Sequence, residues 1–195
     1  KEVSIRADSV LPMVTWGTAQ DQVTAVTGFI PIQDVHCDAL LYMGPSAQAI
    51  CNISIDQAFI GPCTNGRFSD LLAASYVLKN RKVRVPLLIS PDSMMIAKRV
   101  HNAGLVEIFK NAGATWTSSS CSLCVGMNGD RIAPEARYAL SSNRNFCGRQ
   151  GPAARTHLMS PAMGAAAAVA GRIVDVQVIG SIESSSSSNE AVHQN

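Results

Sequence analysis

Short apolar runs alternate with amphipathic stretches along most of the chain. Residues 55–60 have the pattern of a buried strand, and residues 68–79 carry apolar side chains at helical spacing. Further strands are expected at 85–89, 114–117, 136–140 and 156–159, and further helices from the Ser93 turn to about His101, at 105–111, and from Pro161 to Gly171. This order predicts an α/β fold, a three-layer α/β/α domain with a mostly parallel sheet.

The chain length indicates one domain rather than two. We expect a single globular unit over residues 1–180, because 195 residues suffice for one well-buried core. Five consecutive serines at 184–188 lie in a low-complexity segment that has too few apolar side chains to build a core. Residues 181–195 are therefore predicted to be a flexible tail.

Composition excludes several classes of partner. Hydrophobic residues make up 47% of the chain and charged residues 15%, with a formal net charge of +2. No basic stripe for nucleic acid and no polybasic patch for a membrane is present, and no apolar run approaches the roughly 20 residues of a membrane span. The first residues also lack a signal-peptide pattern. We expect an intracellular, most simply cytoplasmic, protein.

Three of the six cysteines follow predicted strands. Cys63 comes after the strand at 55–60, and Cys121 and Cys124 come after the strand at 114–117. The carboxyl ends of parallel strands are where α/β sheets bind ligands. Three thiolates are suited to zinc with an open position or to a 4Fe–4S cluster with one iron free of protein ligands. Spacing alone leaves buried free thiols equally open, and small core or loop residues are the reading for Cys37, Cys51 and Cys147.

The residues around these cysteines resemble motifs of the aconitase superfamily, in the isopropylmalate dehydratase branch. Residues 55–67 are similar to its Cys-Thr-Asn loop, 121–128 to its Cys-x-x-Cys loop and 141–151 to its arginine loop. Residues 155–158 and 160–163 follow in the family's order, and Val-Thr-Trp-Gly-Thr at 14–18 is typical of isopropylmalate dehydratases. The resemblance covers residues 5–177 and implies an aconitase-type domain.

What the family does implies a site and an activity. Its members are lyases that isomerise hydroxy acids by removing water and adding it back, with an iron as Lewis acid. The resemblance implies Cys63, Cys121 and Cys124 as ligands of a 4Fe–4S cluster. It implies Arg144 and Arg149 as groups that hold the carboxylates of a small-molecule substrate, and Asn143 as the polar neighbour that bonds to the cluster region. His101 and His157 are interpreted as structural or surface residues.

The chain is much shorter than a full family member, which leaves two hypotheses. In the first, it is a cluster-binding piece of a hydro-lyase that needs partner domains, including the small subunit or swivelling domain that supplies the base. In the second, it is a repurposed relative without a cluster, acting as a metal-free isomerase, lyase or cyclase or as a binding protein, and covering its old interfaces as a homo-oligomer. The second draws on local departures from the family pattern, at Pro62, at residues 118–120 and at Cys147.

Overall fold

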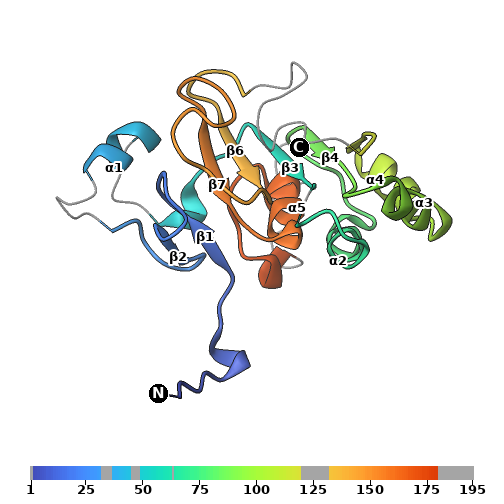
Figure 1. Cartoon of the computed structure of the whole chain (residues 1–195), viewed down its shortest axis with the longest axis horizontal. Coiled ribbons are helices and arrows are strands. Elements are labelled where there is room, and N and C mark those ends of the chain that lie inside the picture. Colours follow the sequence, from blue (N-terminus) through green and yellow to red (C-terminus); the bar gives the residue numbers. More distant parts are fainter. Residues whose placement is uncertain (1, 32–36, 45–48, 63, 120–131, 180–195) are drawn as a thin grey trace, which may run out of the picture.

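A five-stranded sheet forms the centre of the computed structural model, which describes residues 2–31, 37–44, 49–62, 64–119 and 132–179. All neighbouring strands are parallel, in the order β5-β4-β3-β6-β7 (Figure 1). The strands are β3 (Gln57–Ile60), β4 (Leu87–Ile89), β5 (Thr115–Trp116), β6 (Arg137–Leu140) and β7 (Arg155–Leu158). The chain moves from β3 outward to β5, and then returns to β6 on the other side of β3. The strand order therefore reverses between β3 and β6, the position where such sheets bind ligands.

Helices connect the strands where the sequence pattern predicts them. They are α2 (Phe68–Leu78), α3 (Met94–Asn102), α4 (Leu105–Ala112) and α5 (Pro161–Ala170). Ser93 caps α3 by accepting a hydrogen bond from Ile96 N at 3.3 Å, and Ser160 caps α5 in the same way. Gly171 ends α5 in the left-handed conformation that glycine adopts without strain. Local capping chemistry thus explains why α3 and α5 begin, and why α5 ends, within a residue of the predicted bounds.

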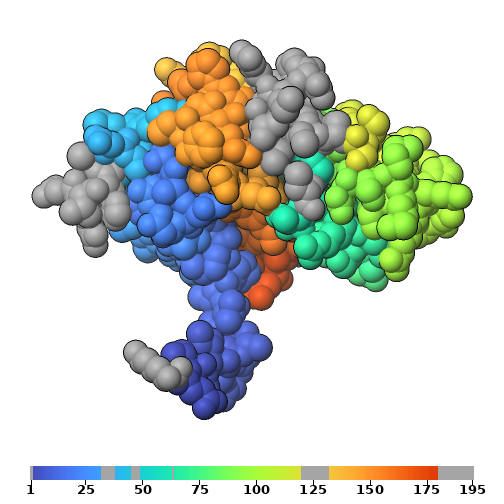
Figure 2. Space-filling view, in the orientation of Figure 1, coloured from blue at the N-terminus to red at the C-terminus, as the bar shows by residue number. Residues whose placement is uncertain are grey.

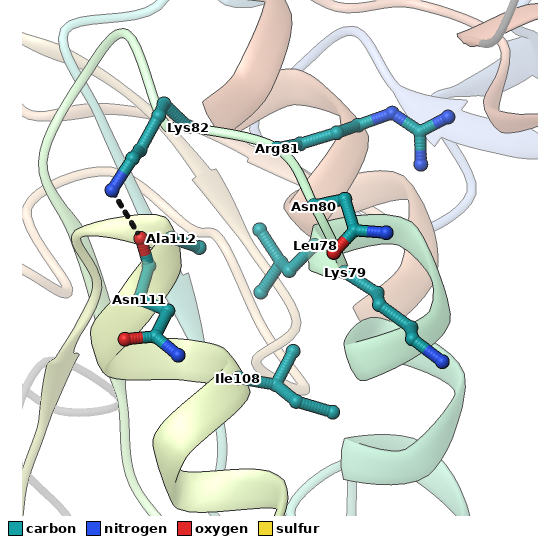
Figure 3. Close-up of a pocket in the computed structure, with 8 residues that line it drawn as sticks. All are labelled: Leu78, Lys79, Asn80, Arg81, Lys82, Ile108, Asn111 and Ala112. Atoms are coloured by element: carbon teal, nitrogen blue, oxygen red, sulfur yellow. Dashed lines mark hydrogen bonds between the residues drawn. The ribbon is translucent and has the colours of Figure 1, made fainter.

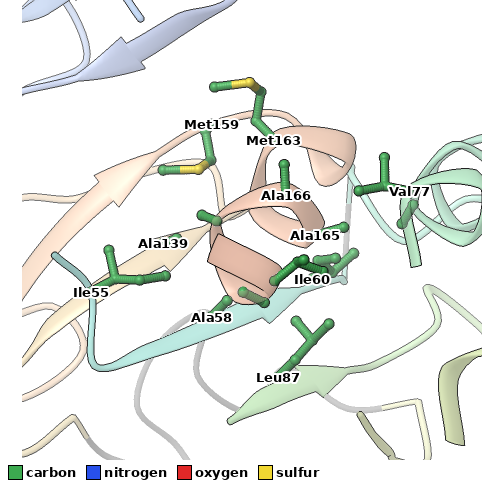
Figure 4. Packing of buried hydrophobic residues seen from close by; sticks show 14 of the residues in the cluster. Ile55, Ala58, Ile60, Val77, Leu87, Ala139, Met159, Met163, Ala165 and Ala166 are labelled. Atoms are coloured by element: carbon green, nitrogen blue, oxygen red, sulfur yellow. The ribbon is translucent and has the colours of Figure 1, made fainter. Parts of the chain in front are cut away.

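The main core lies between one face of the sheet and helices α2, α4 and α5. Figure 4 shows α5 beside β3, with Ala165 near Ile60, in a buried cluster that also holds Ala58 and Ala166. Residues 165–168 are all alanines without exposed surface. Because alanine is small, α5 approaches both the sheet and α2 closely, and α2 and α5 share one of the largest helix contacts in the fold.

A second hydrophobic cluster lies on the opposite face of the sheet. Phe59 of β3 and Leu140 of β6 point to this side and pack with Ile132 and Ala154 from the connecting segments. Alternating side chains along β3 and β6 therefore reach two different cores, as expected for a sheet covered on both faces. The parallel sheet with its helices is consistent with the predicted three-layer α/β/α class.

The N-terminal part forms a small unit beside β7. It contains the antiparallel pair β1 (Met13–Thr15) and β2 (Val23–Ala25), followed by α1 (Cys37–Met43). The short 3-10 helices η1 (Ala7–Ser9), η3 (Ile50–Asn52) and η5 (Val176–Val178) complete the described elements. Residues ahead of β1 extend away from the body (Figures 1 and 2). The sequence pattern did not predict this hairpin or α1, and the predicted tail at 181–195 lies outside the described residues.

Two arginines at the start of neighbouring strands hold the end of α1. Arg137 donates to the carbonyl of Met43 at 2.6 Å, and Arg155 Nε donates to the carbonyl of Tyr42 at 3.2 Å. The last carbonyls of a helix lack partners within the helix and attract cations. Within the described part of the chain, no helix combines the length and the apolar composition needed to cross a membrane.

Candidate active site

The loops after β3, β4 and β6 are joined at the carboxyl edge of the sheet. Gly61 N donates to the buried hydroxyl of Ser141 at 3.0 Å, which links the first residue after β3 to the first after β6. Ser90 N donates to the carbonyl of Ile60 at 2.9 Å, which links β4 to β3. The strand ends therefore form one connected platform at the point where the strand order reverses.

Gly61 permits the close approach of two of these loops. Its φ is 128°, and a Cβ atom at this position would lie 2.0 Å from the carbonyl oxygen of Ser90. No side chain fits at that distance, and the positive φ is strained for any other residue. Glycine is thus required where the loop containing Cys63 leaves β3.

The Thr-Asn pair that follows Cys63 reaches the arginine loop, residues 141–151. Thr64 donates from its hydroxyl to the side-chain oxygen of Asn143, and Asn65 donates from its amide to the carbonyl of Ser141. These bonds span 79 and 76 residues of sequence. The structure therefore brings Asn143, a residue predicted for the site, to the loop of the first predicted cysteine.

The segment that precedes Cys121 and Cys124, residues 117–119, lies against the loop after β4. Ser90 donates from its hydroxyl to the carbonyl of Ser118 at 3.0 Å, and Ser119 donates to the carbonyl of Asp92 at 3.0 Å. Cys63, Cys121 and Cys124 themselves lie outside the described residues. Among the residues that are described, no three His, Cys, Asp or Glu side chains gather at metal-binding distance.

Cys51 and Cys147 lie where small core or loop residues are expected, as interpreted from the sequence. Cys51 lies half-buried in η3, and Cys147 is exposed in the arginine loop; both are free thiols. The side chain of Cys37 is outside the described part of the structure.

One buried polar atom at the strand edge has no partner. Ser142 follows Ser141 and is 5% exposed, and its hydroxyl makes no hydrogen bond to any residue that the structure describes. An unsatisfied buried hydroxyl costs about 1–3 kcal/mol, so such a group calls for an explanation. Ser142 directly precedes Asn143, so this buried polar group lies next to a residue predicted for the site.

Asn145 fastens the arginine loop to the N-terminal turn, residues 15–22. Its side-chain nitrogen donates to the carbonyl of Gly17 at 2.7 Å and to the hydroxyl of Thr15 at 3.2 Å. A carbonyl can only accept, so this contact fixes the orientation of the amide. Gln20 adds a second tie by donating to the carbonyl of Asn143, and Gln150 donates to the carbonyl of Arg144 at 3.0 Å.

The two predicted arginines of this loop point to different surroundings. Arg144 is exposed and lines a pocket of about 460 Å³ formed with residues 18–21, Asn145 and Phe146. Arg149 is half-buried, and its guanidinium carbon lies 5.2 Å from the ring centre of Phe146. The described residues therefore place Asn143, Arg144 and Arg149 on one loop, with Arg144 alone of the three in this pocket.

A second pocket, of about 340 Å³, lies away from the predicted residues. Figure 3 shows it between the ends of α2 and α4, with Leu78 and Ile108 among its lining residues. Lys82 Nζ donates to the carbonyl of Asn111 at 2.6 Å, so this cation already satisfies the end of α4. None of the residues predicted to bind substrate or metal is among those that line this pocket.

The two histidines have structural or surface positions, as interpreted from the sequence. His101 is exposed near the end of α3. His157 is fully buried in β7, and burial together with nearby Arg137 lowers its pKa to about 3. Burial also lowers the pKa of Arg137 and raises that of Tyr138. A histidine held neutral in this way is not suited to exchange protons with a substrate near pH 7.

The N-terminal turn is the part of the site that sequence reasoning missed. Residues 14–18 were recognised as a family-typical motif, but nothing in their spacing connected them to residues 141–151. The sequence did offer one sign of this role. Three side chains that can form hydrogen bonds, Thr15, Gln20 and Gln22, lie within eight residues of each other. In the structure, Gln20 donates to the carbonyl of Asn143 in the arginine loop, Thr15 accepts from Leu158 N of β7, and Gln22 accepts from Thr18 N within the turn itself.

Comparisons with known proteins identify the family of the chain. A family model described as the aconitase family (aconitate hydratase) matches residues 1–171. Two curated relatives, each named 3-isopropylmalate dehydratase large subunit 2, come from Salmonella choleraesuis and Salmonella typhimurium. Each is 46% identical over 189 residues, covering 91% of this chain. The chain spans 40% of the length of these relatives. The chain belongs to the aconitase family.

Proposed function

We propose that this chain is the cluster-binding part of a hydro-lyase that acts on a hydroxy-carboxylic acid. The observation that carries the proposal is the pair of hydrogen bonds from Thr64 and Asn65 to the arginine loop. Through them, the loop of Cys63 and the loop of Arg144 and Arg149 belong to one site at the reversal of strand order.

The residues present fit an iron–sulfur cluster. Cys63, Cys121 and Cys124 offer three thiolates, the preferred ligands of iron in such clusters. The carboxyl edge of the sheet, where the described segments before these cysteines end, carries hydroxyl and amide groups, and the buried hydroxyl of Ser142 has no partner there among the described residues. When bound, a 4Fe–4S cluster with one iron free of protein ligands supplies a Lewis acid for the departing hydroxide.

The chain's own residues would bind and orient the substrate. Arg144 and Arg149 are the groups proposed to hold its carboxylates, because a planar guanidinium donates two parallel hydrogen bonds to a carboxylate. Asn143, held by Thr64 and Gln20, would fix the loop that carries them. Bonds of this kind keep the binding groups in place before the substrate arrives, which lowers the entropic cost of binding.

We propose that a partner supplies the catalytic base. The relatives matched here are named as large subunits, and 60% of their length lies outside the match. The one buried histidine of the described sheet is held neutral by its surroundings and is unsuited to the task. Without a base, general-base catalysis on the order of 10²–10⁴-fold would be missing. A small subunit or a swivelling domain is the expected source.

The proposal is tested by the iron and acid-labile sulfide content of protein prepared without oxygen. We expect about four of each per chain. Cys63→Ser, Cys121→Ser and Cys124→Ser should each lose most of the iron. Cys51→Ser and Cys147→Ser are matched controls, since both thiols are free and outside the proposed ligand set, and they should retain it. A folded protein that takes up no iron would favour the alternative, a metal-free relative on another substrate.

A further inference from the structure

The pocket between α2 and α4 lies at the amino edge of the sheet. α2 connects β3 to β4 and α4 leads into β5, so both helices end where the next strand begins. Val83 N donates to the carbonyl of Ala112 at 2.9 Å and joins the segment after α2 to the end of α4. The arginine loop lies at the carboxyl edge, so the pocket is at the opposite edge from the candidate active site.

One wall of this pocket is a turn that the backbone holds in place. α2 ends at Leu78, and Asn80 follows with a φ of 62°, a left-handed conformation that asparagine tolerates better than most residues. Arg81 N donates to the carbonyl of Leu78 at 3.0 Å and closes the turn. The wall is therefore formed by folding, and a ligand would meet it with little ordering cost.

The pocket has an excess of positive charge. Three of its eight lining residues, Lys79, Arg81 and Lys82, are cations, and no carboxylate is among the described residues that line it. Each helix end contributes about half a negative charge, so the two ends together balance about one of the three cations. Glu107 of α4 is paired with Lys110 at 3.6 Å. About two positive charges are left for an anion from outside the chain.

The printed hydrogen bonds show how two of these cations serve the helix ends. Arg81 Nη1 donates to the carbonyl of Val77 at 2.9 Å, and Lys82 Nζ donates to the carbonyl of Asn111 at 2.6 Å. An ammonium has three donors, so Lys82 can bind a further acceptor. The ammonium of Lys79 makes no hydrogen bond or ion pair with any residue that the structure describes. Capping of the helices thus explains Arg81 and Lys82 in part and does not explain Lys79.

Apolar side chains form the floor between the two lysines. Figure 3 shows Leu78 and Ile108 between Lys82 on one side and Lys79 on the other. The cavity, of about 340 Å³, has the size of a site for a small molecule. An organic group that covers this floor gains free energy in proportion to the apolar area removed from water. The ligand that fits therefore has an anionic head and a compact apolar body.

We propose that this pocket binds a small phosphate monoester, with the phosphate at Lys79 and Lys82 and the organic body over Leu78 and Ile108. The three cations lie within four consecutive residues, so the positive charge is concentrated at one place. A phosphate monoester carries about 1.5 to 2 negative charges on one group with three acceptor oxygens. A dicarboxylate spreads its charge over two groups and would bring one of them onto the apolar floor, where a charge is costly to bury.

The test is a titration of the full chain, prepared without iron, followed by nuclear magnetic resonance shifts of backbone amides at fixed ionic strength. The probes are phenyl phosphate, inorganic phosphate and succinate. We expect phenyl phosphate to bind most tightly and to shift residues 78–82 and 108–112. Inorganic phosphate should bind roughly fivefold more weakly, because it leaves the floor uncovered. Succinate should bind more weakly than phenyl phosphate.

Four variants separate the contributions to binding. Lys79→Gln should weaken phenyl phosphate roughly fivefold or more and leave the urea midpoint unchanged, since its ammonium has no described partner to lose. Lys82→Gln should weaken binding similarly, and its amide can still donate to the carbonyl of Asn111. Ile108→Ala should weaken phenyl phosphate and spare inorganic phosphate. Lys98→Gln, which removes an exposed cation of α3, is the control and should change nothing.

Three results would overturn the inference. The first is phenyl phosphate that shifts residues 141–151 in place of residues 78–82. The second is an equal loss of affinity in Lys79→Gln and Lys98→Gln, which would mean general attraction of anions to the chain. The third is succinate that binds as tightly as phenyl phosphate. The iron content of the protein bears on none of these results, so the pocket and the proposed cluster are tested separately.

Discussion

Arg137 and His157 face each other across strands β6 and β7, with Arg137 Nη1 2.8 Å from His157 Nε2. The opposite ring nitrogen, Nδ1, lies 2.7 Å from the carbonyl oxygen of Thr15. Because a carbonyl only accepts, Nδ1 carries the proton and Nε2 accepts from Arg137. The neutral imidazole therefore joins the sheet to the N-terminal hairpin, and a proton on Nε2 would place two cations in contact.

This contact predicts how stability depends on pH. The pKa of His157 is lowered to about 3 in the folded chain, first by burial and then by Arg137, against 6.5 for an unperturbed histidine. Above pH 6.5 the residue is neutral in both states. Below it, the unfolded chain binds a proton that the folded chain does not. The free energy of unfolding should fall by about 1.4 kcal/mol per pH unit from this residue, levelling off near pH 3.

Urea unfolding at pH 8, 7, 6 and 5 measures this slope. The control is His157→Asn, whose side chain keeps a donor for the carbonyl of Thr15 but does not titrate. It should be less stable than the parent at pH 8, and its stability should fall less steeply between pH 6.5 and 5. An equal slope in both proteins would show that His157 is not the titrating group.

Asn145→Ala should loosen the arginine loop. The change removes the bonds to Gly17 and Thr15 and leaves a buried carbonyl without a donor. We expect a loss of about 1–3 kcal/mol in the free energy of unfolding. Amide hydrogen exchange should rise in residues 15–22 as well as in residues 143–150. Asn102→Ala, at the exposed end of α3, serves as the control. An equal loss of unfolding free energy in the two variants would contradict the role given to the bonds from Asn145 to Gly17 and Thr15.

The elements that were predicted from sequence depend on local chemistry. α3 begins directly after Ser93 and α5 directly after Ser160, because the hydroxyl of each serine caps the first turn of its helix. Such signals lie within a few residues of the helix that they start. The N-terminal turn was missed because its role depends on distant partners. Asn145 and Gly17 are 128 residues apart, and no periodicity connects them. Cys63, Cys121 and Cys124 stay a prediction from sequence.

Gly61→Ala tests the close approach of the loops after β3 and β4. The new methyl group would meet the carbonyl of Ser90, and the φ of 128° is unfavourable for alanine. We expect a loss of more than about 3 kcal/mol, or failure to fold. Gly104→Ala is the matched comparison: its φ is 72°, but no atom lies within 4 Å of the new Cβ, so the loss should be about 1–2 kcal/mol. Expression yield and the urea midpoints of the two variants rank their stabilities. An equal loss in Gly61→Ala and Gly104→Ala would contradict the steric argument.

Gly164→Ala should stabilise the protein, although Gly164 is buried in the helix that packs on the sheet. The nearest atom to a new Cβ would be Ile60 Cγ1 at 3.5 Å, an ordinary van der Waals contact. Alanine is favoured over glycine within a helix by about 0.5–1 kcal/mol, and nothing offsets that gain here. The urea midpoint should therefore rise. A fall would mean that α5 and β3 pack more tightly than this distance indicates, and the larger Gly164→Val would then be expected to prevent folding altogether.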